Sequence, residues 1–139
     1  MNYLLDTNVV SETTRPQPDA RLQRWLAAQP NDALFLSVVT IGEIRRGILL
    51  LAAGKKKRSL LRWLEHEIKP VFAGRILPVD AAVMERWAQL QATTEKAGRR
   101  LPIMDTLLAA TALVHSLTLA TRNLADFKPT GVALLDPWQ

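Results

Sequence analysis

Five short apolar segments alternate with longer segments of helical periodicity along this chain, and this alternation constrains the fold more than any other feature. The apolar segments span residues 2–5, 33–37, 75–79, 117–120 and 132–135. Each is long enough for a strand but too short for a stable helix. Neighbouring parallel strands need a crossover connection between them, which is usually a helix. We therefore predict an α/β domain with a mainly parallel central sheet of four to five strands.

The intervening segments carry the start and stop signals of helices. We expect helices over residues 8–14, 19–30, 40–53, 55–73, 80–96 and 103–115. Asp19 and Asp80 stand where N-caps are expected, and Gly54 follows the third of these helices. No repeat, low-complexity segment or linker divides the chain, so we expect residues 1–139 to form a single domain.

The composition indicates what kind of partner the protein binds and in which compartment it is found. Lys and Arg total 18 against 13 Asp and Glu, which gives a net charge of +5 and favours a polyanionic partner such as nucleic acid. The absence of cysteine excludes a disulfide framework, a thiolate metal site and a thiol nucleophile. The first apolar run meets Asp6 too early for a signal peptide, and the tract 107–120 is too short and polar to span a membrane. We expect a cytoplasmic protein.

The acids are sparse and follow the expected strands. Asp6 comes directly after the first strand, Glu43 lies early in the helix after the second, and Asp105 opens an apolar helix. Asn123 and Asp126 follow the fourth strand. Ligands of parallel sheets bind outside the carboxyl ends of the strands, so these side chains can converge on one cleft.

Each acid taken alone also has a structural explanation. Asp6 can be the N-cap of the following helix, and Thr40 with Glu43 matches a capping box. Asp105 can complement the positive end of its helix, and Asp126 can cap a turn. The residues leave both readings open for each position.

Taken together, the acids favour a metal site. Carboxylates that share a cleft raise one another's pKa unless a cation neutralises them. Oxygen ligands without a His or Cys cluster suit Mg²⁺ or Mn²⁺ rather than zinc. Such metals activate water and stabilise the charge of phosphoryl transfer. Beside a basic surface, this chemistry points to hydrolysis of phosphodiester bonds.

Four segments in order along the chain resemble PIN-domain proteins and, more narrowly, the VapC/FitB toxins of bacterial toxin–antitoxin pairs. They are LLDTNVVSE, SVVTIGEIRRGI, IMDTLLAATAL, and ATRNLADF followed by GVALLDPW. The resemblance implies an α/β/α sandwich and a ribonuclease that depends on Mg²⁺ or Mn²⁺. It also implies a homodimer, inhibition by a cognate antitoxin protein, and contact with DNA only through the antitoxin complex.

The resemblance assigns roles to particular residues. Asp6, Glu43 and Asp105 match the three most regular acids of the family's site, and Asp6 and Asp105 are the expected metal ligands. Many relatives have an acid where Asn123 stands, and Asp126 lies one helical turn later. We expect Asp126 to serve as the fourth catalytic acid and Asn123 to contribute a hydrogen bond or to act through water.

Further residues are expected to support the acids or to bind RNA. Asn8 and Thr121 are candidates for orienting the carboxylates. The pairs Arg45–Arg46 and Arg99–Arg100 neighbour the acidic helices, and we expect them to contact phosphates. The helices 40–53 and 55–73 carry surplus apolar residues, which serve either as core or as a groove for an antitoxin helix.

Two other functions fit part of the pattern. A phosphatase with a nucleophilic Asp6 is disfavoured, because Asn8 stands where such sites usually carry a second aspartate. A non-catalytic partner that acts mainly in a DNA-bound complex with its antitoxin is the alternative to the ribonuclease.

Overall fold

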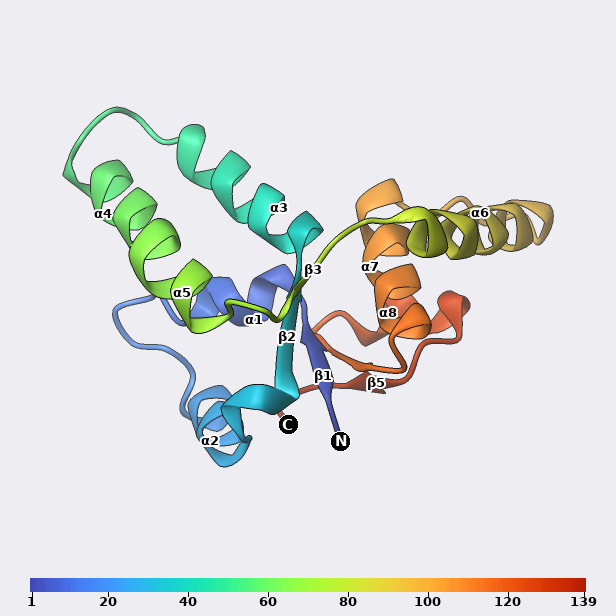
Figure 1. Ribbon diagram of the computed structural model, residues 1–139, viewed down its shortest axis with the longest axis horizontal. Helices are drawn as coiled ribbons and strands as arrows, with labels where there is room; N and C mark the ends of the chain where they lie inside the picture. The colour runs from blue at the N-terminus through green and yellow to red at the C-terminus, as the bar shows by residue number, and fades with distance from the viewer.

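The computed structural model describes residues 1–139 and contains one five-stranded sheet (Figure 1). The strands follow the order β3-β2-β1-β4-β5, and every neighbouring pair is parallel. Their bounds are β1 Tyr3–Leu5, β2 Leu34–Ser37, β3 Ile76–Leu77, β4 Thr118–Ala120 and β5 Leu134–Leu135. The predicted α/β class is confirmed.

Helices connect the strands and cover both faces of the sheet. The helices are α1 Thr7–Glu12, α2 Ala20–Ala28, α3 Val38–Leu49, α4 Lys55–Trp63, a π-helical segment Leu64–Ile68, α5 Lys69–Val71, α6 Ala81–Lys96, α7 Ile103–Val114 and α8 Leu124–Phe127. Short 3₁₀ turns cover Asn31–Ala33 and Lys128–Thr130. None of the helices is long and apolar enough to cross a membrane.

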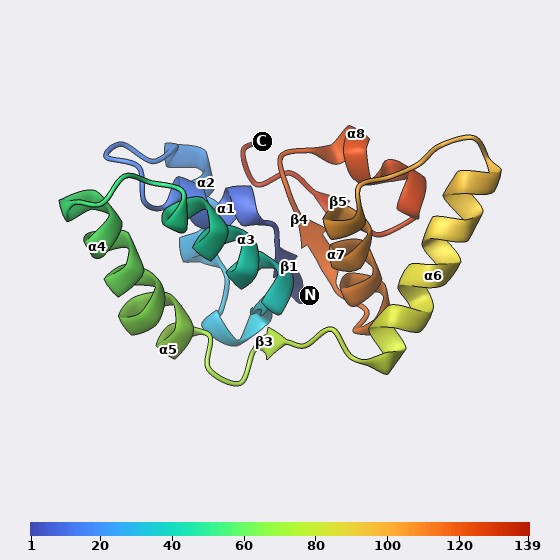
Figure 2. The ribbon, with the colours of Figure 1, turned by 90° about the horizontal axis from the view of Figure 1, so that it is seen from above.

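Two hydrophobic cores lie on opposite faces of the sheet. Leu5 belongs to the core that includes residues of α1, α2 and α3, whereas Leu4 belongs to the core that includes residues of α7 and α8. Successive side chains of a strand point to opposite faces, so neighbouring leucines of β1 fill different cores. Figure 2 shows α3, α4 and α5 on one side and α6 and α7 on the other. This arrangement is the expected α/β/α sandwich.

Side-chain caps fix several helix starts. The side chains of Asp19 and Asp80 accept hydrogen bonds from backbone N–H groups of α2 and α6, as predicted. The predicted start of α3 at Thr40 is wrong, because Ser37 caps the helix by accepting from the N–H of Val39. Thr40 therefore lies inside α3, and the capping box expected with Glu43 does not form.

Other differences concern where elements end. Helix α3 stops at Leu49 rather than near residue 53, and Gly54 precedes α4 instead of following α3 directly. The helix predicted over 55–73 begins at Lys55, but it contains the π-helical turn and ends at Val71. The strand predicted over 75–79 is only two residues long. Hydrophobic periodicity does not indicate the residue at which a backbone hydrogen-bond pattern changes or ends. The predicted ends of these elements are therefore wrong by several residues.

Candidate functional site

The centre of the site is a junction between the ends of the two central strands. Asp6 follows β1 and Thr121 follows β4, and these strands are paired in the sheet. The hydroxyl of Thr121 donates a hydrogen bond of 2.7 Å to Oδ2 of Asp6. Both side chains are buried. The parallel sheet thus places a carboxylate and the group that orients it at its carboxyl edge.

Asp6 serves as the predicted helix cap and remains part of the acidic site. Its Oδ1 accepts from the N–H of Thr7 at 2.7 Å, which caps α1. Its Oδ2 also accepts, at 3.4 Å, from Nδ2 of Asn8. Asn8 and Thr121, the two residues predicted to orient the carboxylates, therefore both contact Asp6. Burial raises the pKa of Asp6, while the hydrogen bonds from Thr121 and Thr7 act in the opposite direction.

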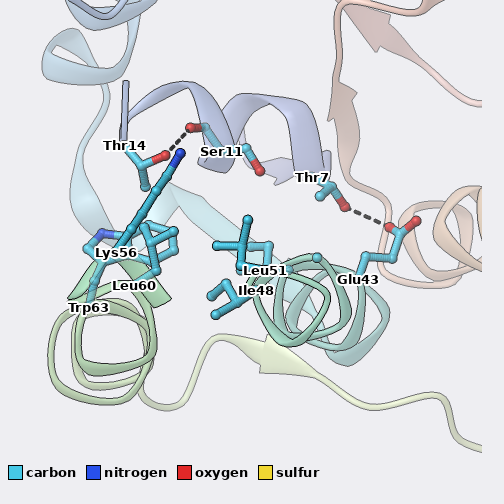
Figure 3. A pocket seen from close by; sticks show the side chains of 11 residues that line it. Thr7, Ser11, Thr14, Glu43, Ile48, Leu51, Lys56, Leu60 and Trp63 are labelled. Atoms are coloured by element: carbon cyan, nitrogen blue, oxygen red, sulfur yellow. Dashed lines mark hydrogen bonds between the residues drawn. The ribbon is translucent and has the colours of Figure 1, made fainter. Parts of the chain in front are cut away.

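Glu43 is held across the site by a residue that sequence reasoning missed. The hydroxyl of Thr7 donates a hydrogen bond of 2.6 Å to Oε1 of Glu43, which joins the start of α1 to α3 (Figure 3). Thr40 makes no such contact, and its buried hydroxyl has no hydrogen-bond partner. The only sequence signal for Thr7 was its place between Asp6 and Asn8, since its partner lies 36 residues away.

Asp105 lies in the first turn of α7 and is half-buried. Its pKa is raised to about 6, first by burial and then by the negative charges of Asp6, Glu43 and Asp126. Glu43 and Asp126 also raise the pKa of Asp6. The four predicted acids therefore lie within electrostatic reach of one another, and their mutual repulsion is the signature of a site that attracts a cation.

The fourth acidic position is divided between two residues of the β4–α8 connection. The backbone N–H of Asn123 donates to the Thr121 hydroxyl at 3.0 Å, so Asn123 is tied to the group that orients Asp6. Its side chain is exposed and makes no capping hydrogen bond. Asp126 is exposed on α8, yet its charge acts on both Asp6 and Asp105.

The donor set suits a hard cation that keeps much of its water. No three His, Cys, Asp or Glu side chains are grouped tightly enough to hold a metal ion by themselves. Mg²⁺ needs only one or two protein carboxylates, because water molecules complete its shell. Oδ1 of Asn8 is buried beside Asp6 without a hydrogen-bond partner, so it is available to a metal-bound water. The residues present therefore fit Mg²⁺ or Mn²⁺.

The two pairs of arginines predicted to bind RNA have different surroundings. Arg45 pairs with Glu65, which also binds Lys69, so the Arg45 guanidinium already has a carboxylate partner. Arg46 is exposed and lines a cleft of about 840 Å³ together with Glu43. The expectation for Arg46 is therefore better supported by the geometry than the one for Arg45.

Arg99 and Arg100 lie between α6 and α7, on the connection that leads to the helix of Asp105. Both side chains are exposed, and Nε of Arg100 lies 3.6 Å from Glu95. An exposed ion pair of this length holds an arginine only weakly. Arg99 and Arg100 therefore remain free to reorient toward a polyanion.

A second cleft, of about 280 Å³, begins at the acidic site and runs between α1, α3 and α4 (Figure 3). Thr7 and Glu43 form its end at the site, and Lys56 reaches toward Thr14 at the other end. Its apolar lining consists of Ile44, Ile48, Leu51, Leu60 and Trp63. The surplus apolar residues of the two helices thus contribute both to the core and to an open groove.

Comparison with known proteins agrees with this fold. Residues 3–130 match the family described as PIN domain. The chain is 45% identical to Toxin FitB of Neisseria gonorrhoeae, with 97% of each chain covered, and 36% identical to VapC ribonuclease Y4jK of Sinorhizobium fredii, with 98% and 97% covered. The solved structure of FitAcB from Neisseria gonorrhoeae superimposes with a TM-score of 0.93 and 44% identity, over 99% of each chain.

Proposed function

This chain belongs to the PIN-domain family, and we propose that it is a metal-dependent endoribonuclease that acts as the toxin of a toxin–antitoxin pair. Its similarity to Toxin FitB and to VapC ribonucleases supports this proposal. The observation that carries it is the convergence of four carboxylates at the carboxyl edge of the sheet, where the charges of Asp6, Glu43 and Asp126 raise the pKa of Asp105. The basic net charge and the site at this edge fit an RNA substrate in the cytoplasm.

In this proposal, Asp6 and Asp105 hold the metal directly or through water. Bound Mg²⁺ or Mn²⁺ supplies an activated water and stabilises negative charge on the phosphate. Thr121 fixes the orientation of Asp6, and the unpartnered Oδ1 of Asn8 would accept a hydrogen bond from a water on the metal. The hydrogen bonds from Thr121 and Asn8 keep the carboxylate of Asp6 in place without neutralising its charge.

Glu43 and Asp126 complete the acidic shell. Thr7 binds Oε1 of Glu43, so Oε2 is left to accept a proton from the attacking water. Asp126 lies in the first turn of α8, and its negative charge acts on both Asp6 and Asp105. Arg46, Arg99 and Arg100 are exposed, and in this proposal they contact phosphates of the RNA.

The groove of Figure 3 is the proposed binding site of the antitoxin. It is apolar along its floor and shares Thr7 and Glu43 with the acidic site, so a helix lying in it would also obstruct the site. Homodimerisation belongs to the same proposal. The exposed apolar residues Val38, Ile103 and Met104, at the starts of α3 and α7, supply a surface for it.

A second function deserves a separate test, because a relative that is 43% identical was solved as FitAB bound to a DNA fragment. In that alternative the chain acts mainly as a non-catalytic partner in a DNA-bound complex with its antitoxin. DNA contact through the antitoxin is compatible with both functions, so only catalysis separates them.

RNA cleavage by the purified protein is the deciding experiment. We expect cleavage with Mg²⁺, none with EDTA, and none by Asp6→Asn, which keeps a good helix cap but lowers the negative charge of the site. Asp80→Asn is the matched control, since Asp80 caps α6 as Asp6 caps α1. Undiminished cleavage with EDTA or by Asp6→Asn would overturn the metal site. A wild-type protein that never cleaves RNA would favour the non-catalytic alternative.

A further inference from the structure

Arg122 is the one arginine that an aromatic ring holds in place while its N–H groups have no partner in the chain. Its guanidinium carbon lies 4.8 Å from the centroid of the Trp138 ring. Four other arginines pair with carboxylates, and Arg75 donates to backbone carbonyls. Stacking on a ring orders a guanidinium without neutralising its charge.

The backbone of Arg122 lies at the carboxyl edge of β4, the edge of the sheet that carries the acidic site. Its neighbours in sequence are Thr121, which binds Asp6, and Asn123, whose N–H donates to the Thr121 hydroxyl. Arg122 thus lies two residues after the end of β4, where this strand is paired with β1. Its side chain is exposed, although both residues that fix its surroundings, Thr121 and Trp138, are buried.

Trp138 is anchored independently of Arg122. It is 4% exposed and packs in the core that contains Tyr3, Val10 and Ala120. Its backbone N–H donates to Oδ1 of Asp136 at 2.9 Å. The C-terminal segment after β5 therefore brings a fixed aromatic surface under the guanidinium of Arg122.

We propose that Arg122 binds a phosphate of the RNA next to the bond that is cleaved, and that Trp138 is a positioning residue that holds its guanidinium for this contact. A guanidinium stacked on a ring keeps its edge free, and this edge can donate two parallel hydrogen bonds to a phosphate. Because the side chain is already ordered, little conformational entropy is lost when the phosphate binds. This inference rests on the proposed ribonuclease function.

The test measures kcat and KM for cleavage of a fluorescently labelled single-stranded RNA oligonucleotide of mixed sequence. Arg122→Ala should raise KM roughly tenfold, the loss of about one charge-assisted hydrogen bond, while kcat stays within about twofold. The slope of log affinity against log salt should fall by about 0.7, as expected for one lost contact to single-stranded RNA. Arg86→Ala, which removes an exposed arginine without an ion pair on α6, is the control.

The role of Trp138 needs a readout that a purely structural role would not change. Trp138→Phe keeps a flat ring and should keep KM close to that of the wild type. Trp138→Leu should raise KM in the wild-type background but leave it unchanged in the Arg122→Ala background. An equal increase in both backgrounds would overturn the positioning role.

The outcomes for Arg122 and for the proposed function are separable. If the wild type cleaves the RNA and Arg122→Ala has the same KM as Arg86→Ala, the phosphate contact is wrong and the stacked pair serves only stability. If the wild type does not cleave RNA at all, the ribonuclease proposal itself fails, and the role of Arg122 fails with it.

Discussion

The hydroxyl of Thr121 donates to Oδ2 of Asp6 at 2.7 Å, joining residues 115 positions apart at the carboxyl edge of the sheet. Thr121→Val should lower metal affinity or activity about 10- to 100-fold, because a ligand's orienting partner is lost. It should also cost about 1 kcal/mol of unfolding free energy. Calorimetric titration with Mn²⁺ measures the change in metal affinity. Thr111→Val is the control, since this buried hydroxyl bonds only to the carbonyl of Leu107 within α7. Equal metal affinities of the two variants would contradict the role of Thr121.

The raised pKa of Asp105 predicts a pH-dependent stability of the metal-free protein. Its folded-state pKa of about 6 exceeds its ordinary value of 3.8, so the folded protein binds this proton more tightly than the unfolded chain. The folded state is therefore penalised as pH rises from about 4 to 6, and the penalty is complete above that range.

Asp105→Asn removes this penalty. In the presence of EDTA it should raise the unfolding free energy at pH 7.5 by about 1 kcal/mol, a value discounted for the partial exposure of the side chain. At a pH well below the ordinary pKa of 3.8 the two proteins should be equally stable, because Asp105 is then protonated in both states. Urea unfolding at the two pH values measures the difference. A gain that is the same at both would contradict the electrostatic origin.

Arg45 and Arg46 are neighbours in sequence but should contribute differently to RNA binding. Arg46→Ala should weaken affinity for RNA about tenfold and reduce its salt dependence, because the free guanidinium faces the cleft of Glu43. Arg45→Ala should change affinity little, because Arg45 is already paired with Glu65. Binding assays at low and moderate salt compare the two variants. A larger loss of RNA affinity in Arg45→Ala than in Arg46→Ala would contradict this prediction. It would show that the Arg45–Glu65 ion pair opens when RNA binds.

The proposed antitoxin groove predicts a contrast between two adjacent leucines. Leu51 lines the groove, whereas Leu50 is 70% exposed and does not. Leu51→Glu should disrupt binding of the antitoxin, because a charge in an apolar groove loses hydration without a partner. Leu50→Glu should bind the antitoxin normally, and both variants should still cleave RNA. Co-purification with the cognate antitoxin tests the contrast, and equal binding by both variants would place the antitoxin elsewhere.

Substitution of Arg75 should lower the stability of the fold without lowering catalysis. Its guanidinium donates to the carbonyls of Asn31, Leu34 and Val71 and lies 5.1 Å from the ring centroid of Phe72. Arg75→Ala should cost about 2 kcal/mol of unfolding free energy, because several backbone acceptors lose a charged donor. Thermal unfolding measures this cost, and the kcat of the folded fraction should not change.

The sequence by itself determined the features that depend on neighbouring residues. The alternation of apolar and amphipathic segments predicted the α/β class, and Asp19 and Asp80 capped the helices that they precede. These predictions succeed because helix starts and strand burial follow from contacts within a few residues. Even here the predicted start of α3 at Thr40 is too late, because Ser37 offers an equally good cap three residues earlier.

The tertiary structure decided which distant side chains meet. Glu43 could cap its own helix or reach across the site, and only the packing of α1 against α3 brought Thr7 to it. From the sequence, Arg45 and Arg46 were expected to behave alike, yet the π-helical turn supplies Glu65 to only Arg45. The partner of a polar side chain depends on the register and orientation of packed elements, which local periodicity does not specify. The same packing encloses Asp6 and raises its pKa, turning a helix cap into part of an acidic site.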